Sequence, residues 1–343
     1  MSPFPNSSID AIDSAVSLTP FPDNSRAAWE RPIPFPVVPP VSDVSPDVAD
    51  TQPLETDTLV ATELVPVAVQ SPEPEQVSQP VVAYQRGETA GIWGLKLDCV
   101  CMAQAVEGIA AMIRDRSPRY VITANLNYAM LNDADQSLRP ITDGASMVLA
   151  DGKPMVWRSK IGAQTPLPER VAGSELIYEL AARAAKEGWR IYFLGALPGV
   201  AQRCADVLAK AYPGMQVAGV QSPPYRKMNE EEEAAMLDHI RDSNPDILLV
   251  AFGQPKGEKW IVEHHEALGV PVSIQLGASF DFIAGTAKRA PKIWQRFGLE
   301  WAYRMSTDPL RLVPRYAANA GFLGISLVRD WRDFVNGRFG VSQ

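Results

Sequence analysis

The sequence predicts an α/β fold built on a mainly parallel sheet that helices cover on both faces, a Rossmann-like arrangement. Two observations support this prediction. Short strands that are apolar throughout alternate with helical segments, which is typical of parallel strands buried on both sides. Polar residues and glycines follow these strands, at the edge where such sheets bind their ligands.

The predicted elements follow one another from Trp93 onward. The clearest strand is Ile247–Phe252, a continuous apolar run between turn residues. Helical spacing of apolar residues predicts a helix over Ser174–Lys186, which Gly188 ends. The other predicted elements are strands at 121–123, 148–150, 191–194, 216–220 and 272–276, and helices from 127, from 151, at 200–212, at 230–241 and at 259–268.

Residues 1–86 differ in composition from the rest and form the first predicted region. They hold 15 of the 30 prolines and 12 acidic residues against three arginines, whereas the whole chain carries a net charge of −8. Their apolar side chains are mostly isolated, so burial cannot offset the entropy of ordering them. We predict a disordered tail without the features of a secretory signal. Its removal should leave the fold intact.

The sequence divides the remainder into a core, residues 87–287, and a basic helical segment, residues 288–343. Aromatic residues are interleaved with lysines and arginines in this last segment, a combination that lipid headgroups attract. An ordinary docked helical subdomain is the alternative. No stretch reaches the ~20 apolar residues of a membrane span. We therefore expect a cytoplasmic protein bound peripherally to the inner membrane.

The sequence offers little to a metal ion. Three cysteines lack ligand spacing with histidine and are expected to be reduced. Asp133-Ala-Asp135 has the Asp-x-Asp pattern of metal-dependent transferases, but it falls in a helical stretch and is interpreted as solvated surface. We expect no metal, no cofactor and no nucleic-acid partner.

Several motifs lie at or near the predicted strand ends, and together they resemble the WecG/TagA/CpsF glycosyltransferases in order and spacing. The resemblance covers about residues 91 to 315. The motifs are Thr123-Ala-Asn125, Ala150-Asp151-Gly152, Glu169-Arg170-Val-Ala-Gly173, Phe193-Leu-Gly195, Gly253-x-Pro255-Lys256-x-Glu258-x-Trp260, Phe280-Asp281, Arg289-Ala-Pro291, Leu299-Glu300-Trp301-x-Tyr303-Arg304 and Pro309-x-Arg311.

The resemblance implies an inverting transfer of a sugar from a UDP-sugar to a sugar on a polyprenyl diphosphate, in exopolysaccharide or cell-surface glycan synthesis. The sugar would be N-acetylmannosamine, its uronic acid or glucose. It also implies that Asp151 is the base that takes the acceptor proton. Helix capping is the alternative for Asp151, and capping is also open for Asn125, which with Thr123 matches residues beside the sugar.

The resemblance further implies metal-free neutralisation of the UDP diphosphate by arginines from the C-terminal segment, with substrate contacts at several strand ends. A structural ion pair is the alternative for Arg170, and a plain loop is the alternative for Pro224 and Tyr225. The implied substrate-binding residues are Arg170, Pro224, Tyr225, Gln254, Lys256, Glu258, Asp281, Arg289, Arg304, Arg311 and Arg315.

One departure from the family pattern concerns the Pro-Lys-Gln-Glu motif, which here reads Pro255-Lys256-Gly257-Glu258. A side-chain amide near the donor is lost, and Gln254 is a candidate to replace it. A dehydrogenase or epimerase is disfavoured because no Gly-x-Gly-x-x-Gly turn follows the first strand. A non-catalytic nucleotide-binding scaffold of a polysaccharide assembly complex stays open. The sequence is compatible with a homo-oligomer.

Overall fold

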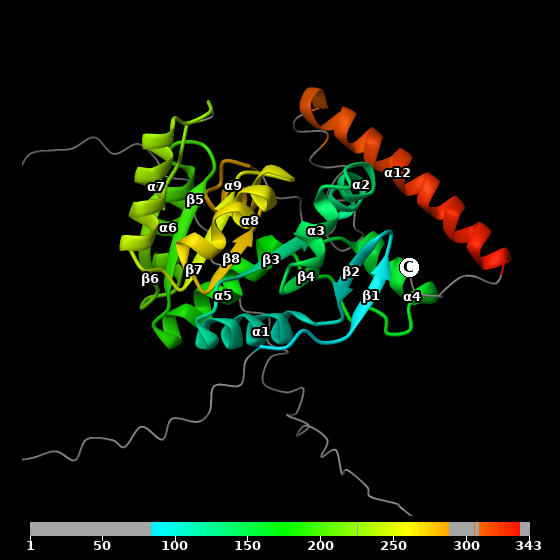
Figure 1. Cartoon of the computed structure of the whole chain (residues 1–343), viewed down its shortest axis with the longest axis horizontal. Coiled ribbons are helices and arrows are strands. Elements are labelled where there is room, and N and C mark those ends of the chain that lie inside the picture. Colours follow the sequence, from blue (N-terminus) through cyan, green and yellow to red (C-terminus); the bar gives the residue numbers. More distant parts are fainter. Residues whose placement is uncertain (1–83, 225, 288–304, 306–308, 337–343) are drawn as a thin grey trace, which may run out of the picture. The chain divides into compact units, whose positions relative to one another are not determined.

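The computed structural model describes residues 84–224, 226–287, 305 and 309–336. These residues belong to one compact unit, which contains a six-stranded parallel sheet in the order β4-β3-β8-β7-β5-β6 (Figure 1). The strands are β3 (Arg119–Ala124), β4 (Met147–Ala150), β5 (Arg190–Gly195), β6 (Gln216–Gln221), β7 (Ile247–Ala251) and β8 (Val272–Gln275). The predicted parallel sheet is confirmed.

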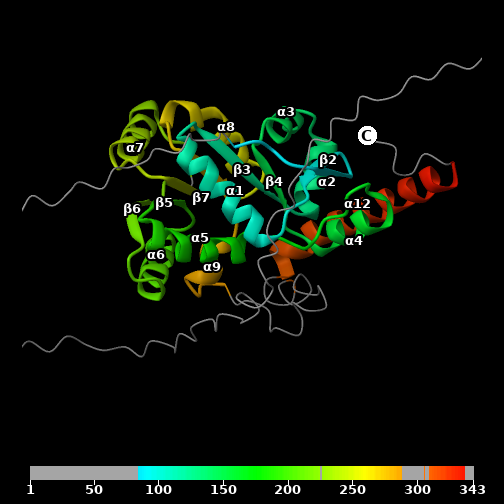
Figure 2. The ribbon, with the colours of Figure 1, turned by 90° about the horizontal axis from the view of Figure 1, so that it is seen from below.

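Helices cover both faces of this sheet. The helices before the C-terminal gap are α1 (Met102–Asp115), α2 (Leu126–Ala134), α3 (Leu138–Asp143), α4 (Lys153–Gly162), α5 (Gly173–Glu187), α6 (Val200–Ala211), α7 (Glu230–Asp242), α8 (Lys256–Leu268) and α9 (Ser279–Ile283). A further helix, α12 (Pro309–Val335), lies against α2. Figure 2 shows α7 and α8 on one side of the strands and α5, α6 and α9 on the other.

The core consists of two apolar layers, because successive side chains of a strand point to opposite faces. Phe193 of β5 packs with residues of α1, α5, α6 and α9, and its neighbour Leu194 packs in the layer that includes residues of α2, α4, α7 and α8. The central strands β5, β7 and β8 are buried almost throughout, which explains their unbroken apolar sequences.

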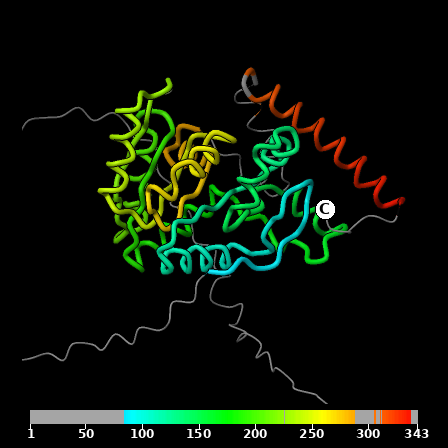
Figure 3. The backbone as a smooth tube through the Cα atoms, in the orientation of Figure 1, coloured from blue at the N-terminus to red at the C-terminus, as the bar shows by residue number. Residues whose placement is uncertain are grey.

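A β-hairpin before the sheet was missing from our sequence-based expectations. It consists of β1 (Thr89–Ile92) and β2 (Leu95–Asp98), which pair antiparallel (cyan in Figure 3). Buried and exposed residues alternate along β1. Both turn residues, Trp93 and Gly94, have positive φ, as tight hairpin turns require, and tryptophan is an unusual residue there. The atypical turn residue hid the hairpin.

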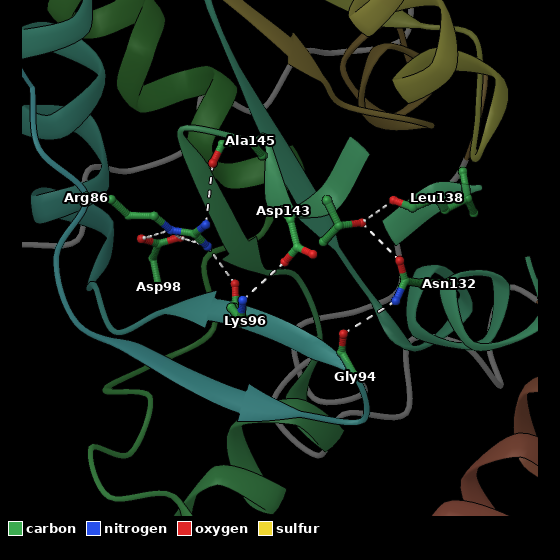
Figure 4. A network of polar contacts seen from close by, with 9 residues as sticks. Arg86, Gly94, Lys96, Asp98, Asn132, Leu138, Asp143 and Ala145 are labelled. Carbon is green, nitrogen blue, oxygen red and sulfur yellow. Dashed lines mark hydrogen bonds and ion pairs between the residues drawn. The ribbon is translucent and has the colours of Figure 1, made fainter. Parts of the chain in front are cut away.

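Arg86 connects this hairpin to the sheet, as Figure 4 shows. Its guanidinium forms an ion pair with the buried Asp98 at 2.9 Å and donates to the carbonyl oxygens of Lys96 and Ala145. Asp98 also accepts a hydrogen bond from the backbone of Val148 in β4 at 2.7 Å. Tyr84 packs against the core as well. The chain therefore contacts the fold from residue 84, three residues inside the predicted tail.

The rest of the predicted tail, residues 1–83, lies outside the described residues, as does most of residues 288–308. Beyond that gap, the predicted helical character of the C-terminal segment is present as α12. Leu312, Asn319, Phe322 and Ser326 form the buried side of this helix. The Phe322 ring packs edge-on against Trp93 of the hairpin turn, with 6.2 Å between ring centroids.

Candidate active site

The carboxyl ends of the parallel strands lie in register. Thr123 and Ala124 of β3 pair with Leu149 and Ala150 of β4, and Gln275 at the end of β8 pairs with both β3 and β7. The residues that follow these strands therefore emerge along one edge of the sheet. Neighbouring strands are about 4.8 Å apart, so the chain segments after β4 and β8 leave the edge about 10 Å from each other.

Asp151 follows β4 directly and is half-buried. Its backbone N–H donates to the Ala124 carbonyl at 2.8 Å, which continues the β3–β4 ladder by one residue and fixes the point at which its side chain leaves the sheet edge. Helix α4 begins at Lys153 with Gly152 as its N-cap residue, so Asp151 lies one residue before the cap.

Thr123 and Asn125 lie at the end of β3, beside Asp151. The Thr123 hydroxyl is buried and donates to the backbone carbonyl of Gln275 at 2.9 Å. Asn125 is the N-cap residue of α2, because its Oδ1 accepts from the backbone N–H of Tyr128 at 3.1 Å. The capping role for Asn125 is confirmed. Its Nδ2 stays a donor at the sheet edge, so capping and a substrate contact are compatible.

A chain of side-chain amides crosses the same edge. Gln254 Nε2 donates to the Thr123 carbonyl at 3.0 Å, and Asn127 Nδ2 lies 3.5 Å from Gln254 Oε1. Arg315 of α12 donates from Nε to Asn127 Oδ1 at 3.1 Å. The amide of Gln254 therefore binds the protein backbone at the end of β3.

Glu258, in the first turn of α8, is 1% exposed. Neither carboxyl oxygen has a hydrogen-bond partner among the described residues. Burial raises the pKa of Glu258 to about 7, and the nearby Gln254 amide, whose hydrogen bond goes to Thr123, offsets this only in part. A carboxyl group without partners in an apolar setting favours its protonated form. Contact of Glu258 with a substrate stays a prediction, and burial argues for a role beneath the site.

The side chain of Gln275 fills the space that a side chain at position 257 would need, where the family pattern has glutamine and this chain has glycine. A Cβ atom on Gly257 would lie 2.5 Å from the Cγ atom of Gln275. The Gln275 side chain is buried, and its Oε1 accepts a short hydrogen bond from the backbone N–H of Gly277. Sequence reasoning missed this residue because it lies inside a strand. The only signal was the glycine at 257.

The other described candidates lie around this edge. Arg170 forms an ion pair with Glu175 at 2.6 Å, so the structural alternative for Arg170 is present. Lys256 is exposed, with Nζ 5.6 Å from the centre of the Phe252 ring. Asp281 lies in α9, two strands from Asp151 along the edge, and its Oδ1 accepts from the Thr286 hydroxyl at 3.3 Å. Pro224 is exposed in the segment after β6.

Four of the predicted substrate-binding residues cannot be placed in this way. Tyr225, Arg289 and Arg304 lie outside the described residues, and of Arg311 only the backbone in α12 is described. Their assignments stay predictions.

The aspartates of the Asp-x-Asp pattern are engaged on the surface. Asp135 pairs with Lys259 at 2.9 Å and Asp133 with Arg329 at 3.4 Å. Hydrogen bonds from Ser137 and from the Lys259 ammonium hold the pKa of Asp135 down to about 2. Within residues 84–224, 226–287 and 309–336, no group of three or more His, Cys, Asp or Glu side chains is placed to hold a metal ion.

A doubly covered parallel sheet with a carboxylate and several amides at its carboxyl edge is the arrangement typical of α/β enzymes, which bind their ligands at that edge. Residues 90–335 match the sequence profile of the glycosyl transferase WecG/TagA/CpsF family. The chain belongs to this family and is a glycosyltransferase.

Relatives from Bacillus and Staphylococcus are similar to this chain over most of their own length. A protein of Bacillus spizizenii strain W23 is 31% identical over 202 residues, which cover 57% of this chain and 76% of the relative. A protein of Staphylococcus aureus strain NCTC 8325 is 30% identical over 235 residues, 66% of this chain and 89% of the relative. Both are named N-acetylglucosaminyldiphosphoundecaprenol N-acetyl-β-D-mannosaminyltransferase.

Proposed function

We propose that this chain transfers a sugar from a UDP-sugar to a sugar on a polyprenyl diphosphate, with inversion at the anomeric carbon and without a metal ion. N-acetylmannosamine, as in the names of both relatives, is the first candidate for the transferred sugar. Its uronic acid and glucose are the alternatives. The observation that carries the proposal is the position of Asp151, held at the end of β4 beside the polar end of β3.

In this mechanism Asp151 accepts the proton of the acceptor hydroxyl as its oxygen attacks the anomeric carbon. The new glycosidic bond forms on the face opposite the leaving group, and the bond to UDP breaks with its electron pair on the departing diphosphate. A base placed in this way typically contributes 10²–10⁴-fold to the rate. Thr123 and Asn125 border the reacting sugar from β3, the strand that pairs with β4.

The departing diphosphate requires positive charge, which we assign to arginines of the C-terminal segment. Arg315 is held by Asn127 in the first turn of α2, close to the end of β3. A guanidinium there stabilises the developing negative charge on UDP. We assign the same function to Arg289, Arg304 and Arg311, and we assign contacts with the uridine to Asp281, Pro224 and Tyr225.

The exposed side of α12 supports attachment to a membrane surface, where a polyprenyl-linked acceptor resides. A continuous row of exposed apolar or glycine residues runs along it at spacings of three and four, which places them on one face of a helix. This apolar stripe consists of Leu310, Val313, Ala317, Gly321, Gly324, Val328, Trp331 and Val335. Within the described residues, no helix is both long and apolar enough to cross a bilayer. We propose peripheral binding at the cytoplasmic face.

UDP release tests this proposal directly. Purified protein is mixed with liposomes that contain a polyprenyl-diphosphate-linked N-acetylglucosamine acceptor and with each UDP-sugar in turn. One donor should give acceptor-dependent UDP release, and analysis of the lipid product should show one added sugar. A non-catalytic scaffold would bind UDP but release none with any donor.

A further inference from the structure

Three hydrogen bonds connect α12 to the catalytic edge of the sheet. Arg315 of α12 donates to Asn127 in α2 at 3.1 Å, and Asn127 lies 3.5 Å from Gln254 in the turn after β7. Gln254 in turn donates to the carbonyl of Thr123 at 3.0 Å. The contacts thus join three parts of the chain that are far apart in the sequence: α12, the turn after β7, and the end of β3 with the start of α2. They end one residue before the polypeptide leaves β3.

Arg315, at one end of this series, determines which group of each amide donates and which accepts. An arginine side chain has donors only, so the oxygen of Asn127 must face Arg315 and its NH₂ group must face the opposite way. The oxygen of Gln254 then faces Asn127, which turns the Gln254 NH₂ group toward Thr123. Each amide therefore fixes the orientation of the next, and the guanidinium charge polarises the series.

Burial of Asn127 means that water cannot easily take the place of a lost hydrogen-bond partner in this series. Asn127 is 8% exposed, so a lost partner is not readily compensated by solvent. The buried carboxyl of Glu258 lies near Gln254 and offers its amide a competing acceptor.

We propose that Asn127 and Gln254 are positioning residues that transmit the docking of α12 to the end of β3. When α12 is docked, Arg315 orients both amides and the Thr123 carbonyl is held. When α12 leaves, the amides lose their fixed orientation and the segment that carries Thr123 and Asn125 loosens. This inference rests on the proposed function for its catalytic consequence, but not for the structural coupling.

Hydrogen–deuterium exchange of the protein without substrate tests the coupling. Arg315→Met should raise exchange about three- to tenfold in peptides that cover residues 119–126 and 250–256, the range expected for loss of one hydrogen bond. Arg329→Met is the matched control, because Arg329 also joins α12 to α2 but pairs there with the exposed Asp133, away from Asn127 and Gln254. Equal exchange at the β3 end in both variants would overturn the proposal.

Asn127→Asp separates the orientation of the amides from the docking of α12. The new carboxylate keeps an acceptor for Arg315 but presents a second acceptor to Gln254, which must turn its NH₂ group away from Thr123. Exchange at residues 119–126 should rise while exchange in 312–326 stays as in the parent. Gln254→Glu, which removes the donor to Thr123, should give the same pattern. An unchanged β3 end in both variants would refute the inference.

Kinetics distinguish positioning from general stability. With the donor identified by UDP release, Asn127→Asp and Arg315→Met should each lower kcat while the KM for the donor changes less than twofold. The kcat of the double variant should be no lower than that of the less active single variant, because both changes break the same series of hydrogen bonds. Multiplicative losses would show independent action and contradict the proposal. Absence of transferase activity would end the proposed function, and the exchange data would still decide the coupling.

Discussion

The Nε atom of Arg315 on α12 donates to Oδ1 of Asn127 on α2 at 3.1 Å. We had expected Arg315 to bind the diphosphate of the donor. The contact fixes the position of one nitrogen of the guanidinium, and the diphosphate contact stays a prediction. Because Asn127 follows β3 within three residues, Arg315 lies next to the strand that borders Asp151, where the proposed function requires positive charge for the leaving group.

Replacing the proposed base gives the first prediction. Asp151→Asn keeps the size of the side chain but removes its capacity to accept a proton, so UDP release should fall by at least about 100-fold. UDP affinity, measured by calorimetry, should change less than threefold, because the leaving group binds elsewhere along the edge. Asp238→Asn, which alters an exposed ion pair with Arg241 within α7, is the control. Turnover within tenfold of the parent would exclude Asp151 as the base.

The boundary of the N-terminal region gives a second prediction. Removal of residues 1–83 should leave the free energy of unfolding unchanged, whereas removal of residues 1–86 should lower it by about 2–4 kcal/mol. The larger deletion removes Arg86 and so leaves the carboxylate of Asp98, which is 2% exposed, buried without its ion-pair partner. Our expectation that residues 1–86 are dispensable for the fold is therefore revised.

Urea denaturation measures both deletions, and two point variants reproduce the comparison in the full chain. Arg86→Ala should also be destabilised, but less than the longer deletion, because it keeps Tyr84 packed against the core. Lys96→Ala breaks an ion pair with Asp143 in which both side chains are about 60% exposed, and it should cost less than 1 kcal/mol. Equal stability of the two deletions would show that the Arg86–Asp98 contact contributes nothing.

The main architecture could be predicted from the sequence because its signals are local. Each central strand is a continuous apolar run, since both faces are buried, and Gly188 ends α5 in the left-handed conformation that favours glycine. The placement of Asp151 followed from the same rule about strand ends. These features depend on residues close together in the chain.

The parts that escaped prediction depend on contacts between distant segments. Nothing near Gln275 indicates that its side chain occupies the space beside Gly257 on another element. Glu258 is the acidic residue of the Pro255-Lys256-Gly257-Glu258 motif, yet the packing of α8 buries its side chain. The coupling of Arg315 to Gln254 passes through Asn127, whose role depends on where α12 docks. Such relationships arise only when the elements are assembled.

The buried carboxyl of Glu258 gives a third prediction, on the pH dependence of stability. Its pKa is raised from 4.5 to about 7, so the folded state keeps a proton that the unfolded chain releases over that interval. The associated stability is fully present below pH 4.5 and is lost as the pH rises to about 7. Glu258→Gln stays neutral and removes this dependence.

The comparison is made by urea denaturation at pH 5 and pH 8. Relative to the parent, Glu258→Gln should gain stability on going from the lower to the higher pH, by an amount on the order of 2–3 kcal/mol at most. Glu263→Gln, an exposed change in the same helix, should show no such gain. A parallel pH response in parent and Glu258→Gln would mean that this carboxyl is ionised in the folded protein.

Metal independence gives a fourth prediction. UDP release in the presence of EDTA should stay within twofold of the untreated rate, because positive charge from arginine replaces that of a metal ion. Asp135→Asn should also be tolerated, since Asp135 pairs with Lys259 on the surface. Loss of activity with EDTA that Mg²⁺ or Mn²⁺ restores would contradict the metal-free mechanism.

The apolar stripe of α12 gives the last prediction. Trp331 and Val328 are 66% and 60% exposed, so a charged side chain at either position costs the folded protein little stability. At a lipid surface, however, a charged side chain cannot insert among the acyl chains. Burial of one such side chain contributes about 1.5–3 kcal/mol. Val328→Glu should therefore weaken binding to anionic liposomes at least tenfold in a flotation assay. Val217→Glu places the same charge on an exposed position of the edge strand β6 and should bind as the parent does. With a water-soluble acceptor analogue, Val328→Glu should keep the parent's rate of UDP release, which separates loss of membrane attachment from damage to the site. Equal liposome binding by Val328→Glu and Val217→Glu would mean that α12 does not face the membrane.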